Sequence, residues 1–136
     1  MTSFIVFDSS IYIDEFRTGR HQSRMGLTRG LVRNSSVVLA ELWRGATTAT
    51  ESEAINRLAK NHSILTPTEA NWIESGHILN RIRQETGFRS DKLRDLHFDV
   101  LIALTCRSHG ARLITSNRQD FELIKRFRTF ELEVWA

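Results

Sequence analysis

Cysteine is nearly absent from the sequence, and long apolar runs are missing altogether. Because Cys106 is the single cysteine, the chain cannot form an internal disulfide, which favours a reducing compartment. No apolar run approaches the roughly 20 residues that span a bilayer. The first residues also lack the basic start and the long apolar stretch of a secretion signal. We therefore expect a cytoplasmic protein without a membrane segment.

Motifs of several large enzyme classes are missing as well. The sequence has no Gly-x-Ser-x-Gly elbow, no P-loop and no Gly-x-Gly-x-x-Gly fingerprint. These absences argue against serine hydrolases, nucleotide kinases and dinucleotide oxidoreductases. The five histidines show no paired spacing for metal binding, and Cys106 has no cysteine partner for a zinc site. The apolar pattern around Cys106 indicates a thiol buried in the core.

The remaining composition is that of an ordinary globular protein with a mild positive charge. At 136 residues the chain has room for one hydrophobic core, so we expect a single domain over 1–136. Lys and Arg outnumber Asp and Glu by 19 to 16, and the sequence pI is about 9.6. A positive field of this size attracts polyanions, among them nucleic acids.

Apolar runs alternate with helical patterns along the chain. Strands are expected at 4–7, 36–39, 111–115 and, as a half-exposed edge strand, 130–135. Helices are expected at 9–16, 40–45, 51–61, 67–85, 96–109 and 121–127. This alternation predicts an α/β fold, a three-layer α/β/α sandwich with a mainly parallel central sheet.

The long helix in the middle of the chain has the clearest local start signal. Thr66 is expected as its N-cap, with Pro67 at the first helical position and Glu69 completing a capping box. The face of this helix that packs in the core is expected to carry Ile73, Gly76, Leu79 and Ile82. The polar stretch 87–94 that follows is expected to be a surface loop.

Four acidic residues stand where an apolar run gives way to a turn or a helix start: Asp8, Glu41, Asp99 and Asp120. In an open parallel sheet the carboxyl ends of the strands share one edge, where ligands bind. Each acid alone can be explained as a helix cap or as a favourable charge near a helix start. Caps could fall at either edge of the sheet, however, whereas all four acids follow or face carboxyl ends of predicted strands. The joint pattern favours one shared site.

Such a cluster suits the hydrolysis of phosphodiesters. Mg²⁺ prefers oxygen ligands and is usually held by one or two carboxylates together with the phosphate itself. The ion polarises the phosphoryl oxygen and lowers the pKa of the water that attacks it. Without metal, closely packed carboxylates repel one another, so one of them should keep its proton at a raised pKa. In a basic chain these properties indicate a magnesium-dependent nuclease.

The acids lie in four segments, which span 7–14, 38–45, 98–103 and 113–121. The order and spacing of these segments resemble those of a PIN-domain ribonuclease, in particular a VapC-type toxin of a bacterial toxin–antitoxin pair. The resemblance implies that Asp8, Glu41 and Asp99 form an acidic pocket that binds Mg²⁺ or Mn²⁺. It also implies hydrolysis of single-stranded RNA by metal-activated water, with Asp8 and Asp99 as main ligands and Glu41 completing the pocket.

The fourth position departs from the pattern of many PIN domains. Those place an acid two residues after the threonine that corresponds to Thr115, where this chain has Asn117. Asp120 follows three residues later and either supplies the fourth charge or caps its helix. Asn117, Thr115 and Ser10 are expected as supporting residues that orient the ligands. Contacts to the RNA backbone are expected from Arg44, Arg89, Lys92, Arg94 and Arg118.

The resemblance implies protein partners as well. A cognate antitoxin is expected to place its tail between the early helices and block the pocket, and a second copy of the chain is expected to form a homodimer. The apolar residues that could line such a groove, or belong to the core, are Ile11, Tyr12, Phe16, Leu42 and Trp43.

Two other functions stay open. One is a PIN-like scaffold without catalysis that binds RNA or protein, and Asn117 is its sequence support. The other is a Mg²⁺-dependent phosphotransfer domain that forms a phospho-aspartate. Ser10 counts against it, because the dehalogenase-like pattern has an acid at that position.

Overall fold

The structure, a computed structural model, describes residues 3–135, so both ends of the expected domain 1–136 lie outside the described residues. Its main sheet is parallel throughout and has the strand order β2 (Leu31–Val32), β1 (Phe4–Phe7), β5 (Ala111–Thr115), β6 (Glu131–Val134). A second parallel pair consists of β3 (Asn34–Ser35) and β4 (Ile64–Leu65). The strands predicted at both ends of the chain are confirmed, including the edge position of β6.

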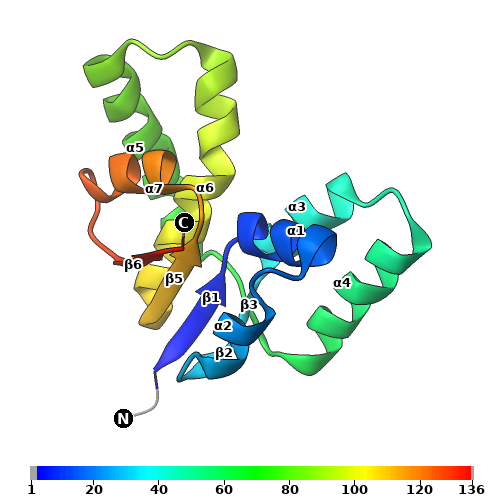
Figure 1. Cartoon of the computed structure of the whole chain (residues 1–136). Helices are drawn as coiled ribbons and strands as arrows, with labels where there is room; N and C mark the ends of the chain where they lie inside the picture. Colours follow the sequence, from blue (N-terminus) through cyan, green and yellow to red (C-terminus); the bar gives the residue numbers. More distant parts are fainter. Residues whose placement is uncertain (1–2, 136) are drawn as a thin grey trace.

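Helices cover the sheet in two groups (Figure 1). One group holds α1 (Ser9–Thr18), α2 (Gln22–Leu27), α3 (Ser36–Gly45) and α4 (Ala49–Asn61). The other holds α5 (Glu69–Thr86), α6 (Ser90–His109) and α7 (Arg118–Lys125). This arrangement confirms the predicted three-layer α/β/α sandwich. Within residues 3–135, no helix combines the length and the apolar character needed to cross a membrane.

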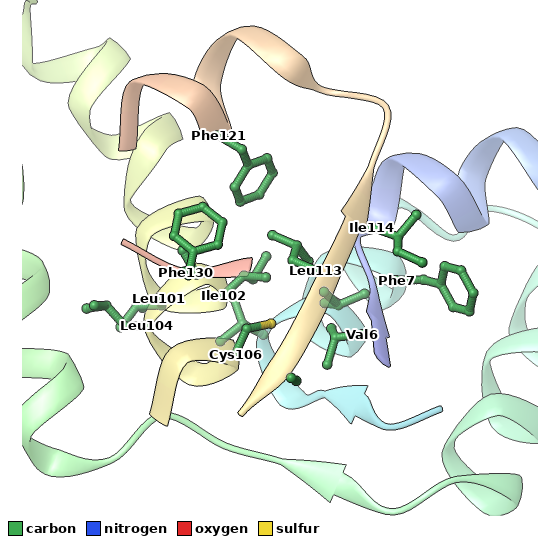
Figure 2. Packing of buried hydrophobic residues seen from close by; sticks show 14 of the residues in the cluster. Val6, Phe7, Leu101, Ile102, Leu104, Cys106, Leu113, Ile114, Phe121 and Phe130 are labelled. Atoms are coloured by element: carbon green, nitrogen blue, oxygen red, sulfur yellow. The ribbon is translucent and has the colours of Figure 1, made fainter. Parts of the chain in front are cut away.

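The central strands β1 and β5 end together at the carboxyl edge of the sheet. Their register pairs Val6 with Leu113 and Phe7 with Ile114, so Asp8 and Thr115 both stand at the carboxyl edge. The four residues of β1 are apolar because both faces of the strand are covered. Figure 2 shows Leu113 on the side of α6, whereas Phe7 and Ile114 point to the opposite side.

Helix α6 contributes a large part of the core. Leu101, Ile102, Leu104 and Cys106 are all buried and belong to the apolar cluster around β5 (Figure 2). Cys106 is the core thiol that the sequence predicts, and its burial raises the pKa of the thiol. Gly110 ends α6 with a positive φ of 65°, as its place after the apolar pattern indicates.

The strand predicted at 36–39 is wrong, because these residues form the first turn of α3. Ser35 is the N-cap, and its hydroxyl accepts hydrogen bonds from the backbone N–H groups of Val37 and Val38 at 3.1 and 3.2 Å. A continuous apolar run is compatible with a buried helix as well as a buried strand. The cap decides for the helix here, since it satisfies backbone donors that a strand would pair elsewhere.

The start of α5 also differs from the prediction. Thr68, not Thr66, is the N-cap, and it forms a capping box with Asn71 in place of Glu69. Pro67 precedes the helix. The predicted core face is only partly confirmed: Ile82 is buried and Leu79 packs partly against the core, whereas Ile73 is 60% exposed. The buried residues of the helix are Asn71, Ser75, Ile78 and Ile82.

Two polar side chains explain that shift of the α5 face. The amide of Asn71 donates to Ser108 Oγ at 3.0 Å, and Ser75 Oγ lies 2.9 Å from His97 Nε2. Both partners lie on α6, so these hydrogen bonds allow polar groups to be buried between the two helices. A rule based on apolar spacing alone cannot detect such a face.

Three further helices begin earlier than predicted, α4 by two residues and α6 and α7 by more. Helix α6 starts at Ser90, so most of the expected loop 87–94 is helical. Helix α7 starts at Arg118, which places Asp120 within its first turn. The short strands β2, β3 and β4 were not predicted, because two residues carry no detectable alternation. Of the tryptophans, Trp135 is buried, whereas Trp43 and Trp72 are about half exposed.

Candidate metal centre

Three of the four predicted acids come together. Asp8 follows β1, Glu41 lies in the second turn of α3, and Asp99 lies near the middle of α6. Each carboxylate offers one oxygen, and these oxygens lie within 4.8 Å of one another. Asp8 is almost completely buried, and the other two are partly buried. The cluster therefore draws on one strand end and on helices from both layers of the sandwich.

Hydroxyl groups hold the Asp8 carboxylate. Ser10 Oγ and Thr115 Oγ1 both donate to Asp8 Oδ2 at 2.8 Å. Asp8 does occupy the N-cap position of α1, but its side chain makes no capping hydrogen bond. Helix capping therefore does not explain this residue. Ser10 and Thr115 are both among the residues expected to support the ligands, and Thr115 comes from the neighbouring strand.

Glu41 has a hydrogen-bond partner that was not predicted. Ser9 Oγ donates to Glu41 Oε1 at 3.2 Å and connects the start of α1 with α3. Burial raises the pKa of Glu41 to about 7, and repulsion from Asp8 adds to the effect. The sequence places Ser9 beside Asp8, but no local pattern relates it to a residue 32 positions away.

Asp99 has the most strongly perturbed carboxyl group of the cluster. Burial raises its pKa to about 8, with further contributions from the charges of Asp8, Glu41 and Asp120. Asp99 lies well inside α6, so the expected stabilisation at a helix start does not apply to it. As predicted for carboxylates without a counter-ion, protonation is favoured at neutral pH.

The fourth acid is held differently. Asp120 forms an ion pair with Lys92 at 3.0 Å and accepts a hydrogen bond from the Asn117 side chain at 3.2 Å. The backbone N–H of Asn117 donates to Thr115 Oγ1 at 3.0 Å, which connects this pair to the Asp8 side of the pocket. Asp120 therefore lies at the rim, with its charge balanced by Lys92. Asp120 lies in the first turn of α7, and Asn117 occupies the N-cap position of this helix.

The predicted RNA-binding residues lie in different surroundings. Arg44 and Arg94 line a shallow depression together with Glu41, and the Arg44 guanidinium lies 5.4 Å from the ring centroid of Phe98. Lys92 is engaged by Asp120, as described above. Arg118 pairs with Glu122 on the same helix, and Arg89 occupies the N-cap position of α6.

A second depression opens beside Glu41, between α1, α3 and α4. It is lined by apolar side chains with charged residues at its margin: Ile13, Phe16, Leu42 and Ile55, with Arg17, Glu41 and Glu51. Of the residues expected in a partner groove, Phe16 and Leu42 line this depression. Ile11 and Tyr12 are buried in the core, and Trp43 is 43% exposed.

The geometry of the site agrees with the outcome of a family comparison. The profile of the PIN domain family matches residues 5–126. The chain belongs to the PIN domain family. This membership confirms the resemblance to PIN-domain proteins that the four acidic segments of the sequence indicate. The sequence has no significant match among curated proteins.

Solved structures share the PIN fold of this chain at low sequence identity. A chain of VapBC2 from Rickettsia felis, bound to a DNA fragment from the promoter, superposes with a TM-score of 0.72 at 18% identity. That match covers 98% of this chain and 99% of the other. A chain of a toxin–antitoxin complex from Klebsiella pneumoniae gives a TM-score of 0.61 at 22% identity, over 86% and 89% of the two chains.

Proposed function

We propose that this PIN domain is a metal-dependent endoribonuclease and the toxin of a toxin–antitoxin pair. The observation that carries the proposal is the convergence of the Asp8, Glu41 and Asp99 carboxylates within 4.8 Å. Membership of the PIN family supports a nuclease over a phospho-aspartate phosphotransfer domain. The fold shared with chains of toxin–antitoxin complexes supports the biological role.

The donor set fits a hard divalent cation. All three groups are carboxylates, and oxygen ligands are those that Mg²⁺ and Mn²⁺ prefer. Ligand oxygens on one Mg²⁺ lie up to about 4 Å apart, so the cluster needs only a small closure around an ion. Burial and, in addition, mutual repulsion raise the pKa of Glu41 and Asp99, and a bound cation would offset both.

Each residue of the pocket has a distinct role in this proposal. Asp8 and Asp99 hold the ion, and Glu41 completes the pocket directly or through water. Ser10 and Thr115 orient the Asp8 carboxylate through their hydrogen bonds. When bound, Mg²⁺ or Mn²⁺ supplies the positive charge that polarises a phosphodiester and eases deprotonation of the attacking water.

Partners follow from the same proposal. A cognate antitoxin is expected to place its tail in the depression between α1, α3 and α4, beside Glu41. The protein is expected to form a homodimer and to act in the cytoplasm. The RNA that is cut depends on surface shape, which the acidic pocket does not define.

The fourth acid supports one alternative, a PIN scaffold that binds without cleaving. Lys92 balances Asp120, and Asn117 replaces an acid, so the pocket has fewer free negative charges than four carboxylates would give. A scaffold of this kind should gain no thermal stability from Mg²⁺ or Mn²⁺, whereas a working pocket should gain it in proportion to occupancy.

Cleavage of total RNA by the purified protein tests the proposal. We expect cleavage with Mg²⁺ or Mn²⁺ and none with a chelator. Asp8→Asn and Asp99→Asn should abolish it while circular dichroism shows an intact fold. Glu53→Gln, which alters an exposed acid on α4, serves as the control and should cleave like the wild type. Full activity of Asp8→Asn or Asp99→Asn, or cleavage without metal, would reject the assignment.

A further inference from the structure

Positive charge is distributed unevenly along this chain. Residues 16–40 contain five arginines and none of the 16 Asp and Glu residues. Over the rest of the chain, 14 Lys and Arg residues are outnumbered by the 16 acids. The whole positive excess therefore lies in one stretch, which we call the arginine segment and define by Arg17, Arg20, Arg24, Arg29 and Arg33.

The arginine segment lies at the surface, where its charge can meet a ligand. It extends from the end of α1 across α2 to β2, and its first four arginines are exposed. Arg20 pairs with Asp14, but within residues 3–135 the guanidinium groups of Arg17, Arg24 and Arg29 form no ion pair. Helix α2 buries none of its side chains, so core packing does not explain its composition.

Two arginines of the segment lie over aromatic rings. The Arg24 guanidinium lies 4.6 Å from the ring centroid of Trp135, and that of Arg33 lies 4.7 Å from the ring of Phe4. Stacking restricts the motion of a long side chain and leaves the N–H groups at the edge of its plane available. Those groups match pairs of phosphate oxygens.

Two sets of contacts relate the segment to the acidic pocket. Arg17 lines the depression that also contains Glu41. On the other side, the ring of Trp135, which supports Arg24, packs against Phe7 at 5.6 Å, directly before Asp8. The Trp135 backbone N–H also donates to the Thr115 carbonyl at 2.8 Å. Arg17 thus lies beside the pocket, and the segment runs from there to the amino end of β1, where Leu31 pairs with Phe4. A chain of phosphates that leaves the pocket past Arg17 can continue along this course.

We propose that the arginine segment binds the sugar–phosphate backbone of the RNA and guides it to the pocket. This inference rests on the proposed ribonuclease function and adds a surface to it. Two of the basic residues expected at the rim are less suited to this role, because Lys92 and Arg118 are already paired with acids. The five arginines are three to five residues apart in the sequence, and a polyanion with regularly spaced phosphates can engage several of them at once, each contact releasing counterions.

Measurements of RNA binding by a catalytically inactive variant test the role of this surface. The background variant is Asp99→Asn, which removes hydrolysis, and the probe is a mixed-sequence single-stranded RNA. Adding Arg17→Gln, Arg24→Gln and Arg29→Gln should weaken binding at least about 10-fold. The slope of log K against log salt should fall by about 2, because each lost phosphate contact contributes about 0.7 for single strands. The matched control removes the same charge at three exposed sites elsewhere, Arg57→Gln, Lys60→Gln and Arg83→Gln.

The outcomes separate the surface from the enzyme. Lysine at the three segment positions should retain most of the salt slope, which shows that charge and not helix stability is responsible. If wild-type protein cleaves RNA while the segment and control variants lose affinity equally, the surface is rejected and the ribonuclease stands. If wild-type protein neither binds nor cleaves RNA, the proposed function itself fails. Arginine-dependent binding of poly-glutamate with unchanged RNA binding assigns the segment to a protein partner and overturns the proposal.

Discussion

The inner part of the acidic pocket and its rim differ in whether their carboxylates have a positively charged partner. Among residues 3–135, Asp8, Glu41 and Asp99 form no ion pair, and two of them have raised pKa values. At the rim, Asp120 is paired with Lys92. The inner carboxylates are thus poised to accept a proton or a cation, whereas the rim carries its own counter-charge. A fold that only needed capping or surface charge would not bring one buried and two partly buried acids within 4.8 Å of one another.

The largest test of this contrast removes one inner charge. A raised pKa means that the folded protein binds the Asp99 proton more tightly than the unfolded chain does. This contribution to stability is complete below about pH 4, the unfolded value, and is lost as the pH rises through about 8. Without divalent ions, Asp99→Asn should therefore melt at a higher temperature than the wild type at pH 8, by about 4 °C or more. At pH 5 the difference should shrink.

Differential scanning calorimetry, first in chelator and then in Mn²⁺, measures the melting temperatures of the wild type and of Asp99→Asn. Mn²⁺ should stabilise the wild type and have little effect on the variant, because a ligand is missing. Glu53→Gln, the exposed acid on α4 that also serves as the control for cleavage, should show neither effect. If Asp99→Asn is the less stable protein in chelator at pH 8, the three acids are not under mutual repulsion.

The second test concerns the hydroxyl groups that distinguish the inner acids from the rim. Thr115 Oγ1 donates to Asp8 and accepts from the Asn117 backbone. Thr115→Val keeps the shape and removes both bonds, so Mn²⁺ affinity should fall about 10- to 100-fold. Isothermal titration calorimetry measures the loss. Thr105→Val is the matched control, because this buried threonine donates only to a carbonyl of its own helix. Equal affinities in both variants would show that Asp8 needs no support.

The sequence identifies the two strand-borne parts of the site better than the helix-borne parts. Asp8 and Thr115 follow from apolar runs that form neighbouring strands, and parallel strands end at a common edge. Glu41 and Asp99 were grouped with them correctly, but for partly mistaken reasons. Residues 36–39 are helical, and Asp99 lies well inside α6. Their approach to Asp8 depends on how α3 and α6 pack, which no local pattern encodes.

Hydrogen bonds and ion pairs between distant residues were the least predictable part. Ser9 contacts Glu41 across 32 positions, and Lys92 contacts Asp120 across 28. Lys92 was assigned to RNA binding because it is basic and near the pocket, whereas its ammonium group is engaged by an acid. A charged residue can be recognised in a sequence, but its partner is fixed only by tertiary structure. The same limit applies to α5, where two buried polar residues extend a face that also buries Ile78 and Ile82.

The smallest expected effect lies at the rim, where the counter-charge can be removed. Lys92 lowers the pKa of Asp99, so Lys92→Gln should leave the pocket more negative and raise Mn²⁺ affinity. The gain should be about 2- to 5-fold, because the lysine is partly exposed and the pair is screened by solvent. Asp120→Asn should change affinity by a similar factor in the opposite direction, and the double variant should return close to the wild type.

Arg118→Gln, which removes the cation of an exposed ion pair on α7, is the control. Titrations at two salt concentrations decide the cause: an electrostatic effect shrinks at high salt, whereas a loss of affinity in Lys92→Gln would mean that the lysine holds the rim in shape.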